Sequence, residues 1–244
     1  MKILIRNTVF FILTAILSLS TVTCADPGTD ELSAYFDTLN VSGEQVWMPN
    51  YNTGKVSQML LKFEGDRNVD VIVMGYTGAS TVGTGKIEGG ILNFNVAVMN
   101  DSNLLDSANL LYIYFNEWYK VGDNGNNIVM TPAVKGNVIT FVTLYNGTTP
   151  SEAIVREGFS GTSSSLTGEY IYYLYVEADC TISVSEEIKK TDLQYTFEKF
   201  DDLSLKRGWN TVCKSETYTT TGESSYSMKV KNPAINWVVQ RTRN

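Results

Sequence analysis

Hydrophobic and polar residues alternate with a period of two along much of the chain after Val41. In residues 91–98, for example, Leu92, Phe94 and Val96 fall on one face, and the other face is mainly asparagine. Alternation of this kind is typical of a strand in an antiparallel sheet that has one side facing water. Two further segments near the end of the chain follow the same pattern, residues 225–231 and 235–240.

Other segments are apolar on both faces, and this pattern predicts central strands over residues 69–76, 110–119, 138–145 and 170–176. Glycine and asparagine turn signals separate these segments. Many short strands with few helical patterns predict an all-β fold, either an antiparallel sandwich or a barrel. We expect one β-rich domain over residues 41–244. Two halves divided near the Ser- and Thr-rich residues 160–167 are the alternative.

One stretch before the strands has a helical period. Leu32, Tyr35, Phe36 and Leu39 recur at i, i+3, i+4 and i+7, so they would lie along one face of a helix. Because a helix of about three turns is marginal alone, we expect it to pack on the domain. Residues 24–40 are therefore predicted to form a spacer followed by a short N-terminal helix.

The first residues have the pattern of an export signal. Lys2 and Arg6 precede an apolar run over residues 8–19, which is shorter than the roughly 20 apolar residues that span a bilayer. The run ends near Cys24, so we expect residues 1–23 to be a signal peptide and Cys24 to carry a diacylglyceryl group and a fatty acyl chain such as palmitate. Cleavage after Ala25 without lipidation is the alternative.

These routes predict different locations. Lipidation would anchor the protein in a bacterial cell envelope, at the outer membrane or the periplasmic face, and plain cleavage would leave it secreted or soluble in the periplasm. The net charge is −7, and it becomes −9 when Lys2 and Arg6 leave with the signal peptide. An acidic chain without a basic run argues against nucleic acid as a partner. The lipid anchor is therefore the expected membrane contact.

Cys180 and Cys213 are the cysteines that remain beyond Cys24. In an oxidising compartment such a pair favours a disulfide, which would stabilise the chain by roughly 3–4 kcal/mol on a chain-entropy model. The alternative is two buried free thiols, because an unpaired cysteine behaves as a small hydrophobic residue.

Several kinds of catalytic chemistry lack their residues. The chain has no histidine, which removes Ser-His-Asp and Cys-His catalysis and His-containing zinc sites. We therefore expect no catalytic residue, metal or cofactor. Paired carboxylates of the kind that glycosidases use remain as the alternative, and the candidates are Asp101 with Asp106, Glu186 with Glu187, and Glu198 with Asp201 and Asp202.

The remaining signal is aromatic, because the chain has 14 tyrosines that are dense in two segments. An exposed row of such rings would form a flat platform for a sugar or a protein partner. Core filling is the alternative, since tyrosine suits a half-buried strand. The candidate platform residues are Tyr112, Tyr114, Trp118, Tyr173 and Tyr175.

Four segments resemble envelope lipoproteins of spirochaete-type bacteria, a group without an assigned activity: residues 84–94, 175–182, 200–212 and 232–239. The resemblance implies an envelope lipoprotein with a β-rich fold, and it implies no reaction or ligand. Thr23 before Cys24 departs from the common lipobox, but spirochaetes use a relaxed form of this motif.

The sequence therefore predicts an exported envelope lipoprotein that acts as a non-enzymatic binding or structural surface protein, with a glycan or a protein as its possible ligand. The alternative is a secreted carbohydrate-binding or carbohydrate-active protein that uses aromatic strand faces and paired carboxylates.

Overall fold

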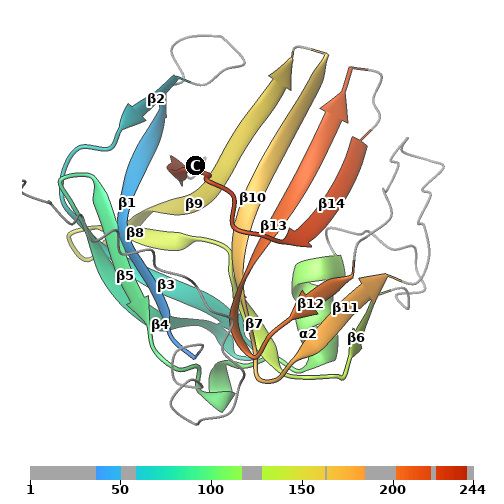
Figure 1. The fold of residues 1–244 in the computed structure, drawn as a ribbon. Helices are drawn as coiled ribbons and strands as arrows, with labels where there is room; N and C mark the ends of the chain where they lie inside the picture. The colour runs from blue at the N-terminus through green and yellow to red at the C-terminus, as the bar shows by residue number, and fades with distance from the viewer. Residues whose placement is uncertain are drawn as a thin grey trace, which may run out of the picture.

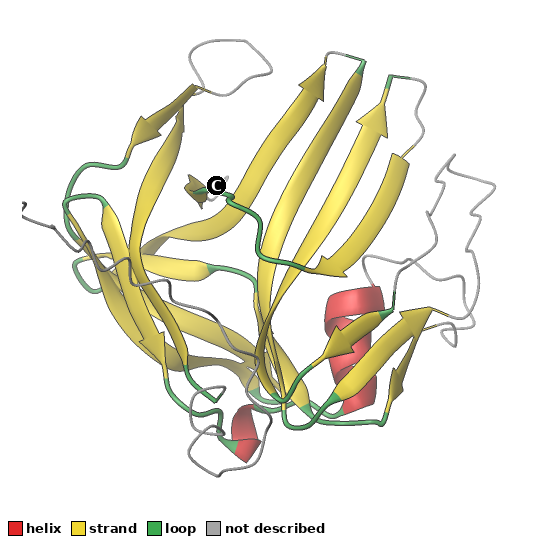
Figure 2. Ribbon diagram, in the orientation of Figure 1, coloured by secondary structure: helices red, strands yellow, loops and turns green. Residues whose placement is uncertain are grey.

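The structure, a computed structural model, describes residues 37–50, 59–116, 128–162, 164–184, 202–220 and 224–240. It confirms the predicted all-β fold, which Figure 2 shows as strands with little helix. The strands are β1 (Leu39–Asn50), β2 (Met59–Lys62), β3 (Arg67–Gly75), β4 (Gly78–Glu88), β5 (Ile91–Val96), β6 (Ile128–Thr131), β7 (Gly136–Ile139), β8 (Val142–Asn146), β9 (Thr149–Thr162), β10 (Ser165–Val176), β11 (Cys180–Val184), β12 (Leu203–Leu205), β13 (Gly208–Thr219), β14 (Ser224–Val230) and β15 (Trp237–Gln240).

Part of the main sheet closes into a barrel. Its strands follow the order β9-β15-β1-β5-β4-β3-β8, and the ring closes because β8 also pairs with β9. One pairing differs from the antiparallel arrangement of the other strands, since β1 and β15 are parallel, with Val46 opposite Trp237. The two strands lie far apart in the sequence, so no turn between them fixes their relative direction.

A second group of strands leaves the barrel at β9. The first half of β9 pairs with β8, where Ile154 lies opposite Val142, and the second half pairs with β10, where Arg156 lies opposite Ile171. Strands β13 and β14 continue the sheet beyond β10. Strands β9, β10, β13 and β14 therefore form a sheet that projects from the barrel (Figure 1).

Hydrophobic side chains form two clusters in the described part of the chain. The larger cluster fills the barrel and includes Leu92, Phe94 and Trp237. The smaller one includes Leu174 and Val212 of the projecting sheet, together with residues of α2 (Ser107–Leu111) and of the three-stranded sheet β12-β11-β6. Strand β10 separates the clusters, because its alternate residues point into one or the other.

The prediction of a strand over residues 110–119 was wrong for residues 110–116, and residues 117–119 lie outside the described residues. Residues 107–111 form α2, and a π-helical turn, η3 (Tyr112–Asn116), follows it; a 3-10 turn, η2 (Asp101–Asn103), comes before. Asp106 caps α2, since its Oδ1 accepts a hydrogen bond from the Asn109 backbone N–H at 2.8 Å. A short apolar run is compatible with a buried helix as well as a strand, so the sequence pattern alone could not separate them.

Other predicted segments have mixed outcomes. Leu39 is the first residue of β1, and Asp37 and Thr38 before it are not helical, so the predicted helix does not extend to Leu39. Residues 32–36 of that helix lie outside the described residues. Residues 160–167, expected to be loop-like, include the paired ends of the β9–β10 hairpin. The structure also contains, within the ranges it describes, no helix that is both long and apolar enough to traverse a bilayer.

Candidate functional site

Most of the predicted tyrosine platform lies in the core. Tyr173 and Tyr175 on β10 are 6% and 5% exposed and belong to the barrel cluster, and Tyr114 is buried in the smaller cluster. The Tyr173 ring stacks on Trp237 at 6.2 Å, and the Tyr175 ring meets Trp209 at 5.3 Å. The prediction of a platform made of these three rings was therefore wrong, and the rings instead fill the core.

The other two residues of that prediction have separate outcomes. Tyr112 is exposed, but it lies on the helical turn η3 and not on a strand with the other rings. Trp118 lies outside the described residues.

Cys180 and Cys213 are buried free cysteines, so the favoured disulfide is not formed and the alternative of two buried thiols describes them. Cys180 lies on β11 in the smaller cluster, whereas Cys213 lies on β13 and faces the barrel cluster. Burial raises the pKa of the Cys180 thiol to about 11, so this group stays protonated at neutral pH.

The opposite side of β10 and its neighbouring strands carries other aromatic and apolar side chains, and we call this surface the aromatic face. Cross-strand register places its members on the same side of the four projecting strands. Its members are Phe159, Leu166, Tyr170, Tyr172, Tyr218 and Val230. Phe159, Tyr218 and Val230 are 44%, 43% and 45% exposed.

A glycine on β10, Gly168, allows two of these rings to lie against the sheet. A Cβ atom built on Gly168 would lie 3.0 Å from the Tyr170 hydroxyl oxygen and 3.2 Å from Phe159, so both rings occupy the space that a side chain would fill. The Phe159 and Tyr170 rings meet edge to face at 6.1 Å. Regular strands therefore hold this aromatic pair in one orientation.

Charged side chains fix the aromatic face on β13. Lys214 forms an ion pair with Glu216, and its Nζ lies 6.0 Å from the centre of the Tyr170 ring. The Tyr218 hydroxyl donates a hydrogen bond to Glu216 Oε2 at 2.6 Å. Burial, with a smaller effect of the Glu216 charge, raises the pKa of Tyr172, so this phenol stays neutral.

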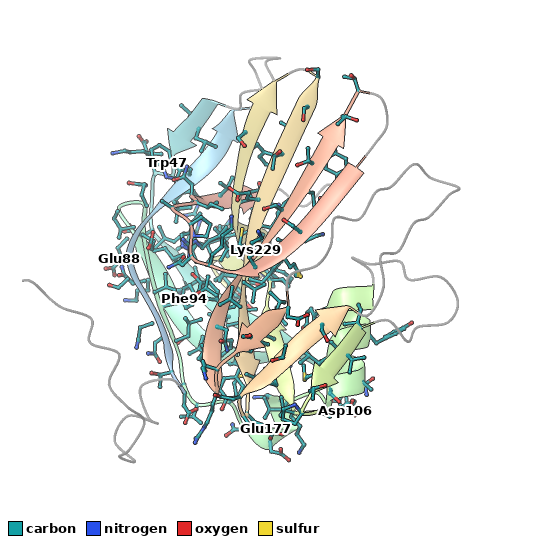
Figure 3. The ribbon with its side chains drawn as sticks, turned by 45° about the vertical axis from the view of Figure 1, so that its right-hand side comes forward. Trp47, Glu88, Phe94, Asp106, Glu177 and Lys229 are labelled. Carbon is teal, nitrogen blue, oxygen red and sulfur yellow. The ribbon has the colours of Figure 1, made fainter. Side chains whose placement is uncertain are left out.

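A second candidate site is an open pocket of about 260 Å³ at one end of the barrel, which we call the barrel-end pocket. It lies between the start of β3, the end of β4 and the turn after β8; Glu88 of its lining lies at the edge of the molecule in Figure 3. The lining residues are Asp66, Arg67, Asn68, Lys86, Ile87, Glu88, Tyr145, Asn146 and Gly147.

The candidate carboxylate pairs have structural contacts where they are described. Asp101 forms an ion pair with Lys135 at 2.6 Å, and Asp106 caps α2. Hydrogen bonds from Tyr76 and Asn109 lower the pKa of Asp106, which is opposite to what a general acid requires. Asp202 is exposed, and Glu186, Glu187, Glu198 and Asp201 lie outside the described residues.

Sequence reasoning missed both sites. The alternation in β10 shows that its tyrosines divide between two faces, but both faces contain apolar residues, so the pattern does not say which face closes the barrel. The barrel-end pocket joins three distant turns, and only the strand pairing brings them together. No protein-family model, curated protein or solved structure matches the chain.

Proposed function

We propose that the protein is a lipid-anchored, non-enzymatic binding protein of a bacterial cell envelope, and that it holds a protein partner on the aromatic face. The observation that carries this proposal is the exposure of Phe159, Tyr218 and Val230 on one side of adjacent strands. Exposed apolar groups gathered on one face are typical of interaction sites.

The size of the aromatic face favours a protein as its partner. Neighbouring strands are about 4.8 Å apart, so the exposed side chains of Phe159 on β9 and Val230 on β14 are separated by three strand spacings, roughly 15 Å. That width exceeds a single sugar ring and suits a protein contact, in which aromatic residues are enriched at the centre. The face is also supported by regular strands, so little ordering would be needed on binding.

The polar contacts around the aromatic face support binding more than catalysis. Lys214 and Glu216 neutralise each other and hold Tyr218, so their charges serve to fix the surface. Glu157 lies opposite Tyr170 on β9, and it accepts a hydrogen bond from Gln240 at 3.0 Å. The membrane anchor itself is inferred from the sequence around Cys24.

Site-specific photo-crosslinking in cells that produce the protein tests this function. A benzophenone amino acid at Phe159 should give an adduct of one defined mass, and the same group at Thr81, an exposed position on β4, should not. The adduct should weaken in a Cys24→Ala background, because the partner would meet an untethered protein less often. Equal adducts at both positions, or no adduct at Phe159, would contradict the proposal.

A further inference from the structure

Three side chains that line the barrel-end pocket are held by contacts with the protein: Asp66, Arg67 and Tyr145. Gly89 and Gly90 have φ angles of 55° and 83°, and this tight turn lets the Gly89 N–H donate to Asp66 Oδ1 at 2.9 Å. The turn therefore fixes the orientation of the Asp66 carboxylate.

Arg67 and Tyr145 are also held. Arg67 Nη1 donates to the backbone carbonyl of Asp66 at 2.8 Å, and its guanidinium lies 5.9 Å from the centre of the Phe63 ring. Tyr145 forms a side-chain hydrogen bond with Asp70, and this bond is the main cause of its raised pKa. Fixed donors and acceptors around a cavity lower the cost of ordering on binding.

The charges of the lining cancel. Asp66 and Glu88 balance Arg67 and Lys86, and Lys86 Nζ already lies 3.6 Å from Glu88 Oε1. A simple anion or cation would gain no net attraction from such a lining. A zwitterion would have to compete with the existing Lys86–Glu88 pair, whereas a neutral ligand could bond to these groups without separating them.

The uncharged part of the lining suits hydroxyl groups. The amides of Asn68 and Asn146 offer both donors and acceptors, and the Tyr145 ring offers an apolar surface beside them. The pocket is slightly below the range of about 300–1,000 Å³ that is common for drug-sized ligands. We propose that the barrel-end pocket binds one neutral sugar unit, either free or at the end of a glycan.

This site shares no residue with the aromatic face, so the two proposals can fail separately. The direct test uses the full mature protein, purified in a detergent without a sugar headgroup. Saturation-transfer NMR and calorimetry would compare three neutral sugars (glucose, galactose and N-acetylglucosamine) with glucuronate, glucosamine and glycine.

We expect at least one neutral sugar to bind, and to bind more tightly than each charged probe. Tyr145→Ala and Arg67→Met should each weaken that binding about tenfold or more, which corresponds to about 1.4 kcal/mol. Tyr145→Phe keeps the ring and should weaken it less than Tyr145→Ala does. Phe159→Ala, on the aromatic face, should leave it unchanged.

Circular dichroism and the unfolding midpoint would show that each variant is folded. Absence of binding by all three neutral sugars would overturn the proposal. Tighter binding of glucuronate, glucosamine or glycine than of every neutral sugar would overturn it as well, and so would full binding by folded Tyr145→Ala.

Discussion

Arg156 places its guanidinium group at a position that is only 7% exposed. Its Nη1 donates to the Tyr173 hydroxyl at 2.8 Å and to Asn232 Oδ1 at 3.1 Å, and its Nη2 lies 3.4 Å from the Pro233 carbonyl oxygen. The guanidinium also lies 5.8 Å from the Trp237 ring. Arg156 therefore fastens the segment that leads into β15 to the wall of the barrel.

Arg156→Leu should lower the free energy of unfolding by about 2–4 kcal/mol. The substitution removes a donor from the buried Tyr173 hydroxyl and from the less buried oxygens of Asn232 and Pro233. A buried group without its partner costs about 1–3 kcal/mol, and this cost is partly offset because a buried charge is removed. Urea unfolding followed by tryptophan fluorescence would measure the loss. Lys62→Met, at an exposed position on β2, is the control, and a loss no larger than in the control would refute this role for Arg156.

Glu157 gives the protein a defined pH dependence. Burial raises its pKa above the ordinary value of 4.5, and the hydrogen bond from Gln240 opposes that shift. The folded chain therefore holds this proton more tightly than the unfolded chain, so the contribution of Glu157 to stability falls as the pH rises through the interval between the two pKa values.

Glu157→Gln stays neutral at every pH, so its stability relative to wild type should increase from about pH 4 to about pH 7. Gln240→Ala removes the group that lowers the pKa and should make the pH dependence of the protein steeper. Urea unfolding midpoints across this range would measure both effects. A difference between Glu157→Gln and wild type that stays constant with pH would be the contrary finding.

At the scale of elements, strands β4 and β5 approach each other closely in the barrel wall. A Cβ atom at Gly85 would lie close to the Asn93 carbonyl oxygen and 2.5 Å from the Phe94 Cβ, which are parts of the paired strand. The backbone of β5 cannot move away without disturbing Phe94, which meets Trp237 edge to face at 5.8 Å in the barrel core.

Gly85→Ala should therefore lower the free energy of unfolding by about 3 kcal/mol or more, at or above the upper end of the usual 1–3 kcal/mol cost of overpacking a core. Thr84→Ala changes the neighbouring exposed residue of the same strand, and it should stay within about 0.5 kcal/mol of wild type. Thermal and urea unfolding of both variants would compare them. Equal stability would show that the strands can separate more easily than the contacts indicate.

The sequence predicted individual strands well where one face was clearly polar. The buried positions Leu92, Phe94 and Val96 of β5 alternate as expected, because that strand has one side toward the core. The pattern failed at residues 110–116, where a capping aspartate and a short apolar run gave a helix. It also could not assign the faces of β10, since both of them contact hydrophobic clusters.

At the scale of the whole molecule, closure of the barrel could not be predicted from the pattern of residues within each segment. The long-range pairs of the ring join β3 to β8 and β1 to β15, and the second of these joins residues near opposite ends of the described chain. The same long-range pairing assembles the barrel-end pocket and turns Tyr173 inward. Composition and turn signals could predict the fold class, but neither candidate surface.

The proposed location depends on the proposed lipid at Cys24, because such an anchor would decide where the protein meets its partner. Intact-mass spectrometry of the protein purified from the membranes of producing cells tests this most directly. The expected species begins at Cys24 and carries a diacylglyceryl group and a fatty acyl chain. A species that begins at Asp26 without any acyl mass would contradict the anchor and leave a secreted protein instead.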